Sequence, residues 1–125
     1  LEIMEGATRE FPGIHHFFTG YSYTNELGEI TKKSPLPHYL KPVLYSGTVY
    51  AHKYIQSVER NEHIHRCPGV LSRRSLIIER CAYRKEAGLI ADDDFFLRVG
   101  QYTDVVGISE PLAQFRIHSE SVEYG

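Results

Sequence analysis

The 125-residue sequence has no tryptophan, one methionine and two cysteines, and these shortages exclude several classes of protein. Cys67 and Cys81 are too few for the disulfide framework of a small secreted domain, so either two reduced thiols or a single bridge is expected. No apolar run approaches the roughly 20 residues that a membrane-spanning helix needs. No secretory signal stands at the start. We therefore expect a cytoplasmic location for this chain.

The sequence also lacks an excess of charge of either sign. Fourteen Lys and Arg face sixteen Asp and Glu, which gives a net charge of -2. No basic block is present, so nucleic acid is not an expected partner. Hydrophobic residues make up 42% of the chain, enough for a packed core, and we expect a single domain over residues 1–125. Because the sequence begins with Leu1 and not methionine, we expect it to be a piece of a longer protein.

The spacing of apolar residues predicts an α/β fold, a mixed sheet with hairpins and short helices. A helix is expected over residues 1–11, and two short helices are expected between the proline-rich stretch 34–37 and residue 61. Two more are expected over 73–81, with Ser72 as N-cap, and over 92–100. Strands are expected over 14–24 and 29–33, which form a hairpin, and over 64–71, 104–109 and 112–117; residues 83–89 are expected to be a loop.

Three consecutive carboxylates, Asp92, Asp93 and Asp94, directly precede the apolar pair Phe95 and Phe96. Negative charge is favourable at a helix N-terminus, so this pattern predicts the start of a helix. A carboxylate held at such a position can also act as a general base that takes a proton from an attacking hydroxyl. The pattern alone leaves both roles open.

Histidines and arginines supply two further candidate sites. His63, His65 and Cys67 can share a zinc ion if the two histidines lie on one face of a strand, and ordinary surface or half-buried histidines are the alternative. Arg73, with its neighbour Arg74, can clamp a phosphate at a helix start through charge-assisted hydrogen bonds. Solvated surface arginines are the alternative there.

Two motifs in the last third of the chain lie in a recognisable order. Residues 92–98 read DDDFFLR, and residues 108–118 read ISEPLAQFRIH. This pair resembles the family 2 glycosyltransferases, which carry Glu-Asp-x-Asp followed by apolar, aromatic, Leu and Arg, and then a segment with Glu-Pro-Leu and a closing Arg-x-His. Weaker likenesses lie upstream in the same order, at residues 11–14, 23–30 and 70–76. The likeness covers the second half of the family's catalytic domain.

The resemblance implies a GT-A-like fold and the acceptor-side half of an inverting glycosyltransferase. Such an enzyme transfers a sugar from a nucleotide-sugar donor to an acceptor hydroxyl on a glycan or a lipid-linked molecule. In the complete enzyme a divalent metal, Mn²⁺ or Mg²⁺, would be held mainly by the other half, and none is expected to bind tightly to this chain. The isolated chain is therefore expected to be inactive. The resemblance leaves open whether the parent protein associates with a membrane.

The resemblance also assigns roles by position. Asp92 matches the general base, and Asp93 is the alternative because Ala91 stands where the family has the glutamate of its acidic pair. Arg98 is expected to support its helix through packing or a salt bridge, and it is also a candidate, with Arg116 and Arg73, to contact substrate or the donor diphosphate. His118 closes the Arg-x-His segment and is the expected metal ligand.

Two further expectations concern partners. A non-catalytic module that binds carbohydrate or protein is the alternative to an enzyme. Because half of a mixed sheet leaves an edge and an apolar face uncovered, we also expect self-association through an exposed sheet edge, with a homodimer as one form.

Overall fold

The computed structural model describes residues 2–33, 41–65 and 69–116 as a five-stranded mixed sheet with helices on both faces. Cys67 and His118 lie outside these residues. The helices are α1 (Glu2–Glu10), α2 (Gly47–Glu59), α3 (Arg74–Glu79), the 3-10 helix η2 (Lys85–Ile90) and α4 (Ala91–Val99). The strands are β1 (His16–Thr24), β2 (Ile30–Lys33), β3 (Val43–Tyr45), β4 (Val70–Ser72) and β5 (Val105–Arg116).

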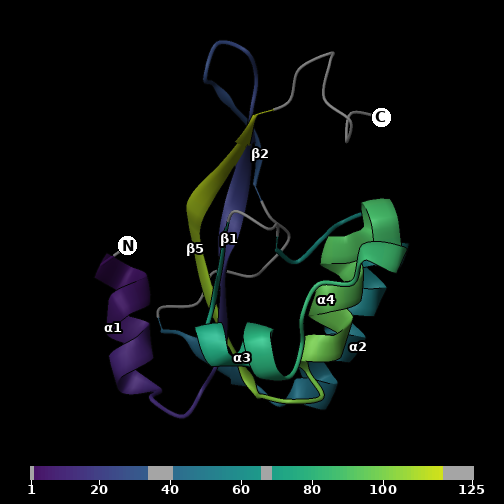
Figure 1. Cartoon of the computed structure of the whole chain (residues 1–125). Helices are drawn as coiled ribbons and strands as arrows, with labels where there is room; N and C mark the ends of the chain where they lie inside the picture. The colour runs from purple at the N-terminus through teal and green to yellow at the C-terminus, as the bar shows by residue number, and fades with distance from the viewer. Residues whose placement is uncertain (1, 34–40, 66–68, 117–125) are drawn as a thin grey trace.

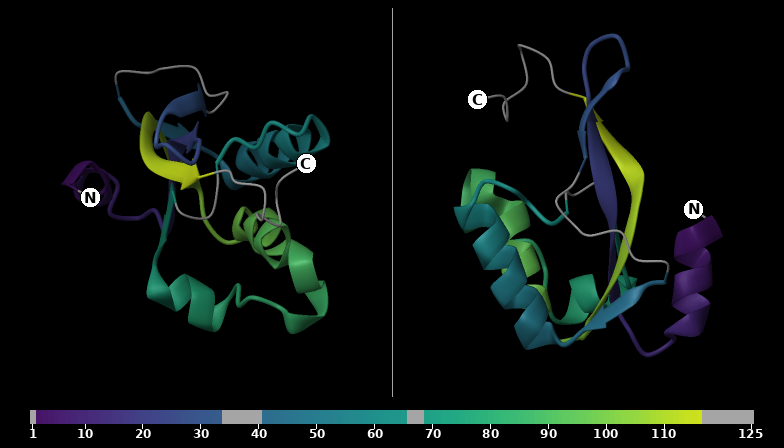
Figure 2. Two further views of the ribbon diagram at one scale, coloured as in Figure 1. Left: turned by 90° about the horizontal axis from the view of Figure 1, so that it is seen from above. Right: turned by 180° about the vertical axis from the view of Figure 1, so that it is seen from behind.

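Strand β1 lies at the centre of the sheet. The order is β2-β1-β5-β3, and β4 also pairs with β1, beside its first three residues. Strands β1 and β5 are parallel, and the other pairs are antiparallel. Helix α1 covers one face of the sheet, while α2 and α4 lie on the other (Figures 1 and 2). Strand β1 is therefore buried along nearly its whole length.

The structure confirms the N-terminal helix, the first hairpin, the second of the two helices expected between residues 37 and 61, and the helices expected over 73–81 and 92–100, whose ends differ by one or two residues. In the hairpin turn, the side-chain oxygen of Asn25 accepts hydrogen bonds from the backbone N–H groups of Leu27 and Glu29, both at 3.0 Å. Gly28 adopts φ +83°, a conformation that favours glycine. The expected mixed α/β class is correct.

Four local expectations are wrong, and a fifth is correct only in part: of the strand expected over 64–71, residues 64 and 65 are not in a strand, 66–68 lie outside the described residues, and β4 begins at Val70. Residues 43–45 are not helical but form β3, which pairs with β5. Residues 85–90 are not a loop but two short 3-10 helical pieces joined by a kink at Gly88, where φ is +59°. Ser72 does not cap α3; its hydroxyl hydrogen-bonds the Nδ1 atom of His16 at 2.6 Å.

The fourth correction concerns residues 104–117, where two strands were expected and the structure shows the single strand β5 up to Arg116. Its register against β1 slips next to Pro111, where Thr19 pairs with Ile108 but Gly20 pairs with Pro111. Proline cannot donate to a ladder, and a bulge accommodates it without ending the strand.

The main core is a cluster of aromatic rings between the sheet and the pair α2 and α4. Its buried rings include Phe18 from β1, Tyr50 and Tyr54 from α2, and Phe95 and Phe96 from α4. His16 and His65 are buried among them, 0% and 1% exposed. A smaller cluster on the opposite face packs α1 against β1 and β5.

Helices α2 and α4 approach each other through two glycines. Gly47 opens α2 and Gly100 follows α4, and a Cβ on either would overlap the carbonyl oxygen of the other. Only glycine permits this approach, because each overlap is with backbone, which cannot rotate away.

We predict that Gly47→Ala lowers the free energy of unfolding by about 1–3 kcal/mol, because the added methyl group forces the two helices apart. Gly6→Ala in α1 is the matched control. It meets open space and should be neutral or stabilising by up to ~1 kcal/mol. Urea unfolding followed by circular dichroism measures both. Equal stability of Gly47→Ala and wild type would refute the close approach.

The two buried histidines predict a loss of stability in acid. Burial lowers the pKa of His16 to about 3 and the pKa of His65 well below its usual value. The unfolded chain therefore binds more protons than the folded chain below pH 6.5. The free energy of unfolding should fall as the pH drops from about 6.5 towards 3, with a slope approaching ~1.4 kcal/mol per pH unit for each histidine.

Urea unfolding at a series of pH values measures this slope. His16→Phe should make it shallower, whereas His52→Gln, at an exposed position of α2, should leave it unchanged. If His16→Phe and His52→Gln have the same slope as the wild type, burial of His16 in neutral form is not the cause.

Candidate functional site

The three consecutive aspartates lie in the first turn of α4, as the sequence predicts. The N-cap residue, Ile90, makes no side-chain hydrogen bond, so none of the aspartates acts as a cap. Helix α4 runs opposite to the parallel strands β1 and β5, and its first turn faces the end of the fold where those strands finish (Figure 1). Asp93 and Asp94 have different hydrogen-bond partners, and Asp92 has none among the described residues.

Asp94 is held by two arginines. Its Oδ2 atom accepts hydrogen bonds from Arg84 Nε at 3.0 Å and from Arg98 Nη2 at 2.9 Å, and its Oδ1 atom accepts one from Arg84 Nη2. Arg98 also donates to the carbonyl oxygen of Ala82 at 2.6 Å. The hydrogen bonds from Arg84, followed by those from Arg98, lower the pKa of Asp94 to about 2. The Asp94 carboxylate is therefore ionised at neutral pH, and the two arginines hold it in place.

Asp93 is held from the other side by α2. The hydroxyl of Tyr54, a residue that is 2% exposed, donates a hydrogen bond to Asp93 Oδ1. Burial raises the pKa of Tyr54, and the hydrogen bond to Asp93 raises it further. The Tyr54 hydroxyl thus stays protonated and keeps the Asp93 carboxylate tied to the core.

Asp92 differs from both neighbours because it is exposed. Within residues 2–33, 41–65 and 69–116, no hydrogen bond or ion pair engages its carboxylate. The helix start fixes its backbone, and its side chain remains accessible to a ligand. Of the three aspartates, Asp92 is the exposed one and has neither oxygen hydrogen-bonded within the described residues, whereas Asp93 has one oxygen bound to Tyr54.

The other expected site residues are dispersed. Arg98 lies on α4, with its guanidinium held by Asp94, and Arg116 is exposed at the far end of β5. Arg73 lies at the opposite end of the sheet, where its backbone N–H bonds the carbonyl of His15 and its guanidinium donates to Pro12 O at 3.1 Å. The structure therefore places Asp92, Asp93 and Arg98 on one helix, where Arg98 pairs with Asp94 rather than with the other two aspartates, and it separates Arg73 from them.

The part of the chain that the structure describes shows no complete set of zinc ligands. In the described part of the chain, no three His, Cys, Asp or Glu side chains come together as a metal site. His65 is buried against Phe96 and Tyr54, and its Nε2 atom pairs with the Tyr50 hydroxyl at 2.7 Å. The third proposed ligand, Cys67, lies outside the described residues.

Two residues of this site were not expected from the sequence, Tyr54 and Arg84. Tyr54 is 39 residues before Asp93, and Arg84 is 10 residues before Asp94. The pairing of Arg98 with Asp94 could have been predicted from the sequence, because an acidic residue four positions before an arginine on a helix can form an ion pair with it. No comparable spacing points to Tyr54 or Arg84.

Comparisons of the chain with family models, curated proteins and solved structures gave no match. Among the helices of the described residues, none has the length and apolar character to cross a lipid bilayer.

We predict that Asp94→Asn destabilises the fold at pH 7, because it removes the charge that Arg84 and Arg98 share. The pKa of Asp94 is lowered from 3.8 to about 2, so its stabilising effect is complete above pH 3.8 and is lost as the pH falls through 2. The difference in melting temperature between wild type and Asp94→Asn should therefore be large at pH 7 and shrink in acid. Asp92→Asn is the matched control, because it removes a first-turn charge that has no arginine partner among the described residues, and it should melt much closer to the wild type at pH 7 than Asp94→Asn does. Equal melting temperatures for Asp94→Asn and Asp92→Asn would show that the arginine pairs contribute nothing.

Proposed function

We propose that this chain is the acceptor-side half of an inverting glycosyltransferase, with Asp92 as its general base. The proposal rests on one observation, that the three aspartates lie in three different environments. Asp94 is held by arginines, Asp93 is tied to Tyr54, and Asp92 is exposed. The free carboxylate is the one that matches the base in the resemblance to the family 2 glycosyltransferases.

The Asp94–Arg98 pair supports the same alignment. In the motif DDDFFLR, the third aspartate and the arginine are four residues apart, and in the structure their side chains form an ion pair along α4. The pair explains why a motif of this kind keeps an acidic residue and an arginine at fixed separation: the two hold the helix that presents the preceding aspartate. Arg98 acts in this account by positioning α4.

The proposed reaction uses Asp92 at one step. An oxygen of the Asp92 carboxylate accepts the proton of the acceptor hydroxyl as that hydroxyl oxygen attacks the anomeric carbon of the donor sugar. The bond from that carbon to the nucleoside diphosphate breaks at the same time, and the electron pair leaves with the diphosphate. Attack from the side opposite the leaving group inverts the anomeric centre.

The divalent metal that the resemblance implies is not assigned to this chain. The described residues offer no set of three ligands, and His118 lies outside them. No step of the proposed reaction is therefore routed through a metal. The donor diphosphate would be bound mainly by the nucleotide-binding half that the resemblance places outside this sequence, so we expect the chain alone to transfer no sugar.

The test is sugar transfer by the enzyme that contains both halves, with common nucleotide sugars and Mn²⁺. We predict that Asp92→Asn lowers kcat about 10²–10⁴-fold while donor binding is kept, because the amide cannot accept the proton. Glu59→Gln, an exposed change at the end of α2, is the control and should have wild-type activity. Asp93→Asn should reduce kcat less than Asp92→Asn.

Two outcomes would overturn the assignment. Loss of transfer in Asp93→Asn with transfer kept in Asp92→Asn would move the base to Asp93. Absence of transfer with every donor would reject the enzyme and leave the carbohydrate- or protein-binding module. Efficient turnover by the isolated chain would contradict the proposal that the donor site lies mainly in another half.

A further inference from the structure

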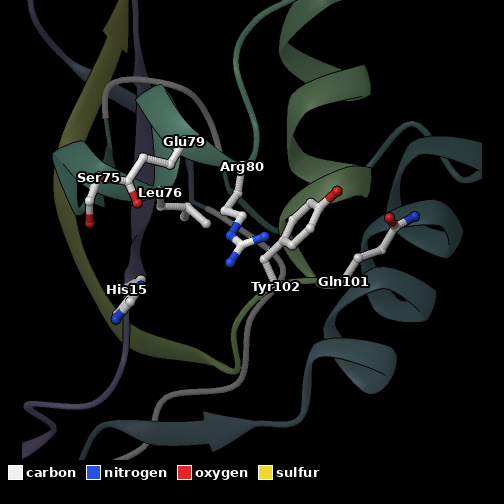
Figure 3. A pocket seen from close by; sticks show the side chains of 7 residues that line it. All are labelled: His15, Ser75, Leu76, Glu79, Arg80, Gln101 and Tyr102. Carbon is white, nitrogen blue, oxygen red and sulfur yellow. The ribbon is translucent and has the colours of Figure 1, made fainter.

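A pocket of about 430 Å³ lies at the opposite end of α4 from Asp92. We call it the His15–Tyr102 pocket; it is lined by His15, Ser75, Leu76, Glu79, Arg80, Gln101 and Tyr102 (Figure 3). Gln101 follows Asp92 by nine positions of largely helical chain, a distance of roughly 14 Å at the helical rise. The pocket is therefore distinct from the aspartate site, and its volume falls in the range of about 300–1,000 Å³ typical of small-molecule sites.

Backbone hydrogen bonds hold the walls of this pocket together. The N–H of His15 donates to the Thr103 hydroxyl at 3.1 Å, and its carbonyl accepts from the N–H of Arg73 at 2.8 Å. Leu76, 2% exposed, anchors α3 in the core beneath the pocket. The segment before β1, helix α3 and the turn after α4 are thus joined into a frame that does not need a ligand to form.

The polar side chains of the pocket are available to a ligand. Arg80 extends from the end of α3 and Tyr102 from the turn after α4, and both reach into the space between these elements (Figure 3). Within the described parts of the chain, no hydrogen bond or ion pair engages the side chains of His15, Glu79, Arg80 or Gln101. Tyr102 is 46% exposed, so part of its ring is open to contact.

The combination of these groups indicates the ligand. Arg80 and Glu79 balance each other in charge, so the pocket favours neither an anion nor a cation. The guanidinium N–H groups donate, the carboxylate accepts, and imidazole does both, which suits adjacent hydroxyls that each donate and accept. The exposed ring of Tyr102 offers an apolar face for C–H groups. We propose that the His15–Tyr102 pocket binds a neutral saccharide.

Other ligand classes fit the pocket less well. A phosphate or other polyanion would meet one arginine, but the Glu79 carboxylate would repel it. A fully apolar ligand would bury the polar side chains without partners, at a cost for each. A saccharide satisfies both the polar groups and the ring. The proposal does not depend on the proposed glycosyltransferase activity.

The test is a titration of the ¹⁵N-labelled chain with methyl glycosides of glucose, galactose, mannose and N-acetylglucosamine and with lactose, cellobiose and maltose. We expect at least one saccharide to shift the amide signals of Arg80, Gln101 and Tyr102 saturably. Tyr102→Ala and Arg80→Ala should each weaken that binding about tenfold. The matched controls on α3, Ile78→Ala and Arg74→Ala, are exposed and lie outside the lining, so they should bind as the wild type does.

The spectra of the variants also report whether each remains folded. No saturable shift with any of these saccharides would overturn the proposal, as would binding that Tyr102→Ala and Arg80→Ala leave unchanged. Asp92→Asn should bind as the wild type does. If Asp92→Asn abolished the shifts, the saccharide would occupy the aspartate site, and the separate pocket would be refuted without deciding the enzymatic proposal.

Discussion

The arrangement of the candidate site depends on one carboxylate, that of Asp94, which binds Arg84 and Arg98 at once. Arg98 in turn donates to Ala82, so this ionic cluster ties the segment before η2 to the first two turns of α4. Without it, three adjacent negative charges would repel each other at a helix start. With it, one charge is neutralised by two arginines, and the remaining two are free to take different environments.

The packing of α4 against the core and against α2 fixes the position of both ends of the helix. Phe95 and Phe96 are buried in the aromatic core, and the contact of Gly47 with Gly100 fixes the helix against α2. At its first turn α4 presents an exposed aspartate; past its last turn it contributes Gln101 and Tyr102 to a pocket. One rigid helix thus positions the proposed base and the proposed saccharide pocket, and the two can be tested separately because each has its own side chains.

The sequence predicted the start of α4 and the first hairpin because local signals determine both: acidic residues before an apolar run, and Asn25 with Gly28 in a turn. It failed for β3, whose three residues are a strand only because they pair with β5, about sixty residues further along the chain. For the same reason the partners of Asp93 and Asp94 on α2 and before η2 were not visible in the spacing. The pocket combines three separate segments, and no periodic pattern in the sequence indicates such a site.

Asp94 is held as an ion by two arginines while Asp92 is left free, and the most direct test of this arrangement is a carboxyl-carbon NMR titration of the folded chain. The side-chain signals of the three aspartates are assigned with the corresponding Asn variants and followed from pH 7 downwards. The account predicts that Asp94 remains ionised where a free aspartate is mostly protonated, with a pKa of about 2. An Asp94 that titrates at its ordinary pKa of 3.8 or above would contradict the account, because the two arginines would then not hold it.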